Sequence, residues 1–306
     1  MPVELYKGLA SMRRDLANTP EEADTIILHQ LAVVKPKSAI VVADDTDIFV
    51  LLCHFLHVGV INIQVWMVAP IKGRSVIDIN ASVGTNDDIM GDLLFMHGLT
   101  GCDTVAPYFG IGKGVALRAL RTQRHSLSLL GDVKAPLNDV VKQCTSFILA
   151  CYGENTDSAS EARYNLWMKK VSRNIANAPK LQSLPPTDEA LFQNIARAHI
   201  QVAVWRNSHE PHPPALDPSS YGWYMKDGSL AAVMIPPNTL LAPDTLLKII
   251  KCSCKGEKPC SRQRCSCNIS GMTCTFFCNC KGEDECWNHY TRINNVIVDS
   301  DSDNDN

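Results

Sequence analysis

The apolar positions of the first half of the chain change their period from one element to the next. Between residues 23 and 34 they recur on one side at helical spacing, which predicts an amphipathic helix that Pro36 ends. The continuous apolar run 39–43 is typical of a buried parallel strand, and 64–68 and 75–79 predict two further strands. Helices are predicted over 48–56, 86–98 and 115–121. The alternation predicts an α/β domain with a mostly parallel sheet.

The second half of the chain has a looser pattern and shifts in composition. Residues 187–206 predict one amphipathic helix, whose apolar side carries Leu191, Ile195, Ala198, Val202 and Trp205. A proline-rich linker, two short apolar runs, a cysteine-rich segment and an Asp/Ser/Asn tail follow. We expect an α/β domain over 1–180, a helix with linker and adapter over 181–250, a cysteine module over 251–292, and a disordered acidic tail over 293–306.

Cysteine usage points to metal rather than to disulfides. Of the 13 cysteines, nine lie between Cys252 and Cys286. The N-terminal residues lack the apolar segment of a secretory signal, and no apolar run is long enough to cross a bilayer. We therefore expect a protein that is neither secreted nor inserted in a membrane, where thiols stay reduced and clustered cysteines bind metal. A secreted disulfide knot is the alternative.

The nine clustered cysteines form three C-x-C pairs that alternate with three single cysteines. They are Cys252, Cys254, Cys260, Cys265, Cys267, Cys274, Cys278, Cys280 and Cys286. Zinc takes four thiolate ligands in a tetrahedron, so three separate sites would need twelve sulfur positions. Nine thiolates suffice if three of them bridge two ions each. The spacing therefore predicts a cluster of about three structural zinc ions, whose binding would supply the folding energy of a segment too short for its own core.

This cysteine pattern resembles the CXC domain of tesmin-type and male-specific-lethal-type DNA-binding proteins, a domain also found in Polycomb methyltransferases. The resemblance covers the whole module, including the closing Cys286-x-Asn288. It implies DNA as a partner, chromatin proteins as further partners, and a nuclear location. Two departures are visible: tesmin-type proteins carry two such modules in tandem, and Arg264 stands where they usually place a DNA-contacting tyrosine.

The charge distribution restricts DNA contact to a local surface. The formal net charge of the chain is -3, so the protein is not coated in basic surface. From Lys251 to Arg264, however, five Lys or Arg residues stand against one Glu. The residues expected on phosphates or in a minor groove are Lys251, Lys255, Arg262 and Arg264. A structural zinc knot that contacts another protein is the alternative.

Acidic residues of the first domain are spaced as for a second, hard-metal site. Glu22 and Asp24 open a helix, Asp45 and Asp47 follow a strand, and Asp103 follows a helix. Ligands of open α/β sheets bind at the carboxyl ends of strands, and gathered carboxylates there favour Mg²⁺ or Mn²⁺. The turn at Gly110 and Gly112, with Lys113, then leads into a helix whose N-terminus suits a phosphate. Asp45 and Asp47 as simple helix caps are the alternative.

The order of these acidic motifs, with the phrases LTGCDTVAPYFGIGKG and YGWYMKDGSLAAV, resembles the flap-endonuclease superfamily of structure-specific nucleases, a PIN-like fold. The nearest variant joins this domain to a CXC module in transposon-like, multicopy animal proteins. The resemblance implies helices on both faces of the sheet and the five carboxylates as ligands of two metal ions. The family's first strand and two further aspartates have no counterpart before Glu22, so we expect a fragment or a catalytically weak remnant. A non-enzymatic DNA or chromatin adaptor is the alternative.

Overall fold

The computed structural model describes residues 3–14, 23–71, 73, 75–123, 126–173, 181–212, 215–235, 251–256, 258–261, 264–269, 274, 278–282 and 285–288. The chain divides into two compact units: residues 1–158 with 189–234, and residues 159–188 with 235–306. The helix that the sequence predicts over 187–206 therefore belongs, from Glu189 onward, to the same unit as the α/β region. The predicted tail over 293–306 and the apolar run 246–250 lie outside the described residues.

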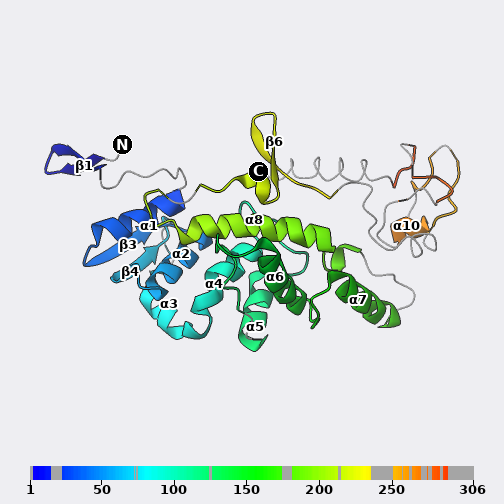
Figure 1. Cartoon of the computed structure of the whole chain (residues 1–306), viewed down its shortest axis with the longest axis horizontal. Helices are drawn as coiled ribbons and strands as arrows, with labels where there is room; N and C mark the ends of the chain where they lie inside the picture. Colours follow the sequence, from blue (N-terminus) through cyan, green and yellow to red (C-terminus); the bar gives the residue numbers. More distant parts are fainter. Residues whose placement is uncertain are drawn as a thin grey trace. The chain divides into compact units, whose positions relative to one another are not determined.

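The first unit begins with short strands and continues mainly in helices (Figure 1). Its elements are β1 (Val3–Tyr6), β2 (Leu9–Met12), α1 (Ala23–Val34), β3 (Ser38–Val42), α2 (Thr46–His57), β4 (Gln64–Val68), β5 (Ile77–Asp78), α3 (Ile79–Thr85), α4 (Asp87–Leu99), α5 (Lys113–Gln123), α6 (Leu137–Cys151), α8 (Asp188–Arg206), η3 (Pro218–Ser220), β6 (Trp223–Lys226) and β7 (Ser229–Ala232). The mixed α/β character that the sequence predicts is confirmed, as are the positions of α1, α2, α4 and α5.

The central sheet is small and only partly parallel. Strands β3 and β4 pair in parallel, with Ser38 opposite Gln64, whereas β5 pairs antiparallel to β4. The predicted mostly parallel sheet is thus not seen in the described ranges, whose strands form three separate small sheets. The reason lies in the connection: only residues 69–76 separate β4 from β5, and a parallel return needs a crossover of about a dozen residues.

The two faces of this sheet differ in burial. Val65 and Met67 are 0% and 4% exposed on the face that the helices cover, whereas Ile40 and Val42 on the opposite face are each 65% exposed. The sequence predicts burial on both faces because the run 39–43 is apolar throughout. The expected helix layer on the second face is not seen in the part of the chain that the structure describes.

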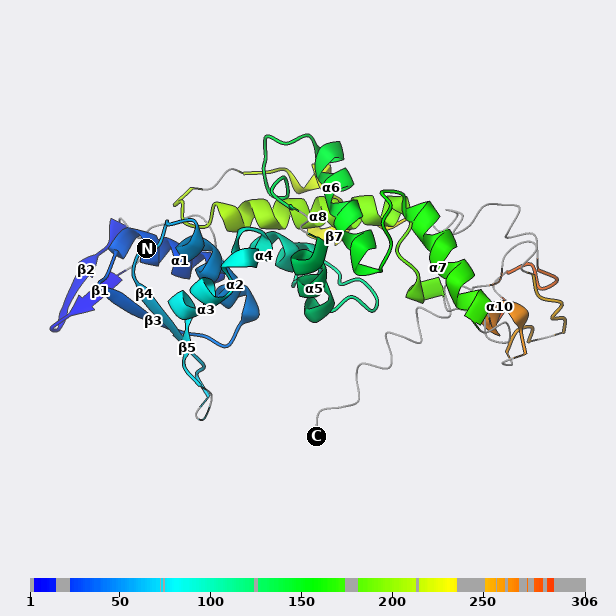
Figure 2. The same ribbon diagram turned by 90° about the horizontal axis from the view of Figure 1, so that it is seen from below.

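Helix α8 packs against parts of the first unit that are distant from it in sequence. All five apolar positions predicted for its inner side are at most 2% exposed: Leu191, Ile195, Ala198, Val202 and Trp205. In both views α8 runs past α4, from which it is remote in sequence (Figures 1 and 2). Polar contacts fix its position: the backbone N–H of Gly131 donates to His199 Nδ1 at 3.0 Å, and Thr104 Oγ1 donates to Gln201 Oε1 at 2.7 Å.

The hairpin of β6 and β7 is attached to α8 by one arginine. Arg197 donates to the carbonyl oxygens of Gly222 (3.1 Å) and Val233 (3.4 Å), which flank the hairpin, and its guanidinium lies 5.8 Å from the ring centre of Trp223. The second unit contains α7 (Ala159–Arg173), η2 (Leu181–Ser183) and the short α10 (Ser266–Ile269). No helix within the described ranges is long and apolar enough to cross a membrane.

Candidate metal centre

The core of the C-terminal segment is made of cysteine side chains. Seven of them are at most 6% exposed and form one cluster: Cys252, Cys260, Cys265, Cys267, Cys274, Cys278 and Cys286. Cys254 and Cys280 are partly buried and pack against that cluster. By contrast, the large apolar side chains of Ile269 and Trp287 are 55% and 47% exposed. The described part of this segment therefore relies on its thiols where an ordinary domain uses aliphatic packing.

The sulfur atoms are spaced as the ligands of zinc are spaced. Six pairs of sulfur atoms lie 3.4–3.9 Å apart: Cys252–Cys260 (3.6 Å), Cys252–Cys274 (3.9 Å), Cys252–Cys280 (3.7 Å), Cys265–Cys274 (3.7 Å), Cys260–Cys274 (3.6 Å) and Cys267–Cys278 (3.4 Å). A tetrahedron with zinc–sulfur bonds near 2.3 Å has edges of about 3.8 Å. All thirteen cysteines are free thiols, so none of these pairs is a disulfide. The cluster can accept metal ions without large rearrangement.

Three overlapping groups of four cysteines have sulfur atoms that all lie within 4.8 Å of one another. They are Cys252, Cys265, Cys267 and Cys274; Cys252, Cys254, Cys260 and Cys265; and Cys252, Cys260, Cys274 and Cys280. Cys252 belongs to all three groups, and three other cysteines belong to two. Such overlap is what bridging thiolates require. The groups lie in one segment of fewer than forty residues, as the alternating spacing predicts.

Backbone hydrogen bonds tie distant parts of the segment together around the sulfurs. The N–H of Asn279 donates to Cys252 O at 3.0 Å, which joins the first C-x-C pair to the last. The N–H of Cys274 donates to Asn288 O at 3.0 Å, and Asn288 Nδ2 donates to Cys274 Sγ at 3.3 Å. Asn288, which closes the predicted motif, is 3% exposed. An amide that donates to a thiolate stabilises its negative charge and orients it.

Basic side chains surround this buried cluster on its outside. Lys251, Lys255 and Arg264, all expected to contact DNA, are exposed, and so is Lys258. Arg262, the remaining basic residue of the predicted DNA contact, lies outside the described residues. The described part of the segment thus buries seven of its cysteines and leaves these cationic side chains on its surface.

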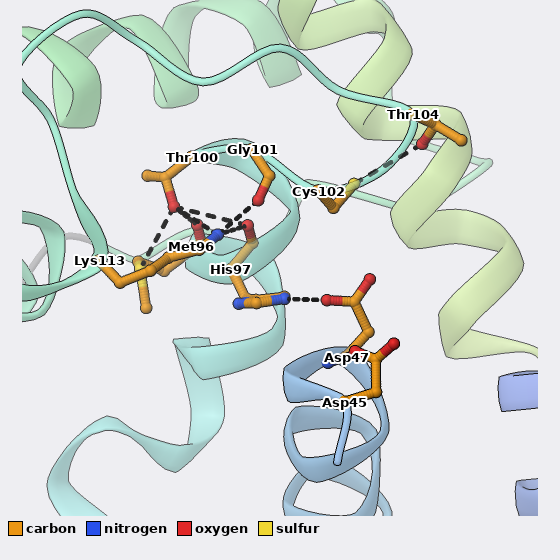
Figure 3. Close-up of polar contacts among 9 residues, drawn as sticks. All are labelled: Asp45, Asp47, Met96, His97, Thr100, Gly101, Cys102, Thr104 and Lys113. Atoms are coloured by element: carbon orange, nitrogen blue, oxygen red, sulfur yellow. Dashed lines mark hydrogen bonds and ion pairs between the residues drawn. The ribbon is translucent and has the colours of Figure 1, made fainter. Parts of the chain in front are cut away.

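Two of the five acidic residues expected to form the hard-metal site, Asp45 and Asp47, follow β3, as the sequence indicates, and each interacts with another group of the protein. Asp45 is the N-cap of α2: its Oδ1 accepts the N–H of Asp47 at 2.8 Å. Asp47 Oδ1 lies 2.6 Å from His97 Nε2, and the two side chains are 16% and 5% exposed (Figure 3). His97 comes from α4, fifty positions away, and sequence patterns gave no signal for this pair.

Lys113 is held by the C-terminal end of α4. Its ammonium group donates to His97 O (2.6 Å), Gly101 O (2.6 Å) and Thr100 Oγ1 (3.1 Å), which engages all three hydrogens (Figure 3). Burial lowers the pKa of Lys113 to about 8. Its predicted contact with phosphate would have to replace these bonds.

The glycine turn before α5 has the predicted form. Gly110 has a φ of 77°, which favours glycine, and the carbonyl of Gly112 accepts the N–H groups of Val115 and Ala116 at 2.9 and 3.2 Å. The turn therefore leads directly into a helix, as the sequence predicts. Its binding to phosphate stays a prediction.

Of the described acidic positions, Asp24 and Asp103 do not join Asp45 and Asp47 in a group whose ligand atoms lie within 4.8 Å of one another. Asp24 is half-buried on α1, Asp103 is exposed in the turn after α4, and Glu22 lies outside the described residues. Burial, with a smaller contribution from the Asp47 carboxylate, raises the pKa of the Cys102 thiol. Within the described ranges, every group of three or more metal-ligating side chains with donor atoms within 4.8 Å consists of cysteines.

No family model, curated protein or solved structure matches the chain. Function is therefore inferred from the residues and geometry of the two sites themselves.

Proposed function

We propose that the protein is a zinc-cluster DNA-binding protein whose C-terminal cysteines hold close to three zinc ions. The observation that carries this proposal is the spacing of the buried sulfur atoms, 3.4–3.9 Å, which fits the edges of zinc–thiolate tetrahedra. Cysteine thiolates are soft ligands and favour zinc over magnesium or calcium. When bound, zinc would supply folding energy to a segment whose described core consists of cysteines.

DNA is the partner that the surface of this module fits best. Its cysteines are buried while Lys251, Lys255 and Arg264 are exposed, so a rigid core would present cationic side chains to phosphates. The resemblance of the cysteine spacing to CXC domains supports the same partner and a nuclear location. A structural zinc knot for protein contact would not need this excess of basic residues.

Replacing Arg262 and Arg264 together with alanine is expected to weaken duplex binding about tenfold at moderate salt and to reduce the salt slope by about two, because fewer counterions are released. Fluorescence anisotropy with a labelled duplex at several salt concentrations measures both quantities. A matched control replaces the exposed Lys134 and Lys226 of the first unit, which removes the same charge from elsewhere. Equal effects of the two double variants would assign DNA binding to net charge and not to the module.

A second candidate function is metal-dependent nuclease activity in the first unit. The position of Asp47 favours it, because this residue follows the carboxyl end of β3, where open α/β sheets bind ligands. Against it, Asp45 already caps α2 and Asp47 already pairs with His97. We therefore favour the adaptor alternative, in which the first unit is a scaffold that does not cleave DNA.

Purified protein is accordingly expected to leave 5′-flap and hairpin DNA uncut in Mg²⁺ or Mn²⁺, with Asp45→Ala indistinguishable from the unaltered protein. Gel analysis of end-labelled substrates provides the measurement. Manganese-dependent cleavage that disappears in Asp45→Ala but persists in Asp44→Ala, its exposed neighbour, would establish the nuclease instead.

A further inference from the structure

Trp287 is an exposed tryptophan on a firmly anchored piece of backbone. Its side chain is 47% exposed, whereas its neighbours Cys286 and Asn288 are 0% and 3% exposed. The backbone N–H of Trp287 donates a hydrogen bond to Pro259 O at 3.0 Å. The next residue, Asn288, is hydrogen-bonded to Cys274 through both its backbone carbonyl and its side-chain amide. The indole is therefore presented outward from a fixed position. A half-exposed indole on an anchored turn can bury further apolar surface against a ligand without moving the backbone.

A cation accompanies this indole. The Nζ atom of Lys258 lies 5.7 Å from the Trp287 ring centre, within the range of a cation–π contact. Lys258 belongs to the basic first half of the module, together with the exposed Lys251 and Lys255. An aromatic face beside a positive charge combines the two components that recognise a nucleotide: the ring stacks on the base and the ammonium group meets the phosphate.

We propose that Trp287 and Lys258 form a stacking site for an unpaired nucleobase, so that the module prefers single-stranded or locally opened DNA to a fully paired duplex. This inference rests on the proposed DNA-binding function and specifies its ligand. Bases inside a duplex are already stacked on both faces, so an indole cannot stack on them. An unpaired base exposes a π-face whatever its identity. Because hydrogen bonds hold the backbone on both sides of Trp287, binding a base costs little conformational entropy of the protein.

The test compares a labelled oligothymidylate with a blunt duplex of the same length, using the zinc-loaded full chain. Trp287→Ala is expected to weaken single-strand binding about tenfold or more while changing duplex affinity less than twofold. Trp287→Phe keeps a stacking ring and is expected to retain most of the single-strand affinity. Ile269→Ala, which removes a similarly exposed apolar side chain (55%) from the same module, serves as the matched control and should bind as the unaltered protein does.

Tryptophan emission gives a second readout that a purely structural role would not produce. Oligothymidylate should quench the emission of the unaltered protein, and Trp287→Phe should bind it with that quenching lost. Zinc content of each variant is measured by native mass spectrometry, and if Trp287→Ala loses zinc the emission result decides. The stacking site is refuted if Trp287→Ala lowers both affinities equally or neither, or if quenching persists in Trp287→Phe. A protein that binds neither nucleic acid would refute the DNA-binding function itself.

Discussion

Cys252→Ser is expected to release essentially all zinc from the C-terminal module and to unfold it. Cys252 belongs to each of the three groups of four close cysteines, so its loss removes a ligand from every candidate site at once. In the residues that the structure describes, the buried cluster of the module consists of cysteines, so the fold depends on its thiols. Structural zinc contributes about 10–16 kcal/mol to such segments, far above the stability margin of an ordinary domain.

Native mass spectrometry of the unaltered protein should show close to three zinc ions, and Cys252→Ser should show none. Two controls separate ligand loss from cysteine loss in general: Ser253→Ala alters the exposed neighbour, and Cys151→Ser alters a buried cysteine (9% exposed) of the first unit. Both should retain the full complement of metal. One zinc in the unaltered protein, or an unchanged count in Cys252→Ser, would exclude the bridged cluster.

Two glycines on α4 are expected to respond in opposite directions to the same substitution. A Cβ atom on Gly98 would lie 2.5 Å from Val202 Cγ2 and 3.2 Å from Trp205 Cζ3, so Gly98→Ala forces α4 and α8 apart. Overpacking of this kind costs about 1–3 kcal/mol. A Cβ on Gly91 would meet only His57 Nε2, at 3.9 Å, and alanine at an exposed helical position stabilises by about 1 kcal/mol.

The free energies of unfolding of Gly91→Ala and Gly98→Ala should therefore differ by about 2–4 kcal/mol. Urea denaturation followed by far-UV circular dichroism measures this difference on the first unit, and unchanged zinc content confirms that the module is unaffected. If both variants are stabilised alike, the close contact between α4 and α8 is not present in solution.

Helices with a regular apolar period were predictable, because that period is a local property of the sequence. The inner side of α8 is the clearest case, since Ile195 and Val202 are both fully buried as expected. The antiparallel direction of β5 relative to β4 was not predictable in this way. It depends on how the chain returns to β4, and an apolar stretch has the same pattern in parallel and antiparallel pairing. The exposure of Ile40 has the same origin, because apolar content alone does not specify what covers a strand.

The two candidate sites also differ in how much of each could be predicted from the sequence. The spacing of cysteines predicts the ligands of a compact module because all of them lie close together in sequence. It does not predict that Cys252 belongs to all three groups of close cysteines, which depends on hydrogen bonds such as that from the Asn279 N–H to Cys252 O. For the acidic site, sequence order indicates Asp45 and Asp47 but not His97, whose contact with Asp47 arises only when α4 packs beside α2.

The discontinuity of the first unit determines when it can finish folding during synthesis. Residues 159–188 belong to the other unit, and Val202 is made 104 residues after Gly98, the position on α4 that it contacts. At ribosomal elongation rates this interval lasts about 5 to 20 s. Until α8 has emerged, the surface of α4 around Gly98 remains open on the nascent chain. During that interval the nascent chain exposes apolar surface that α8 later covers, and such intermediates are prone to aggregation.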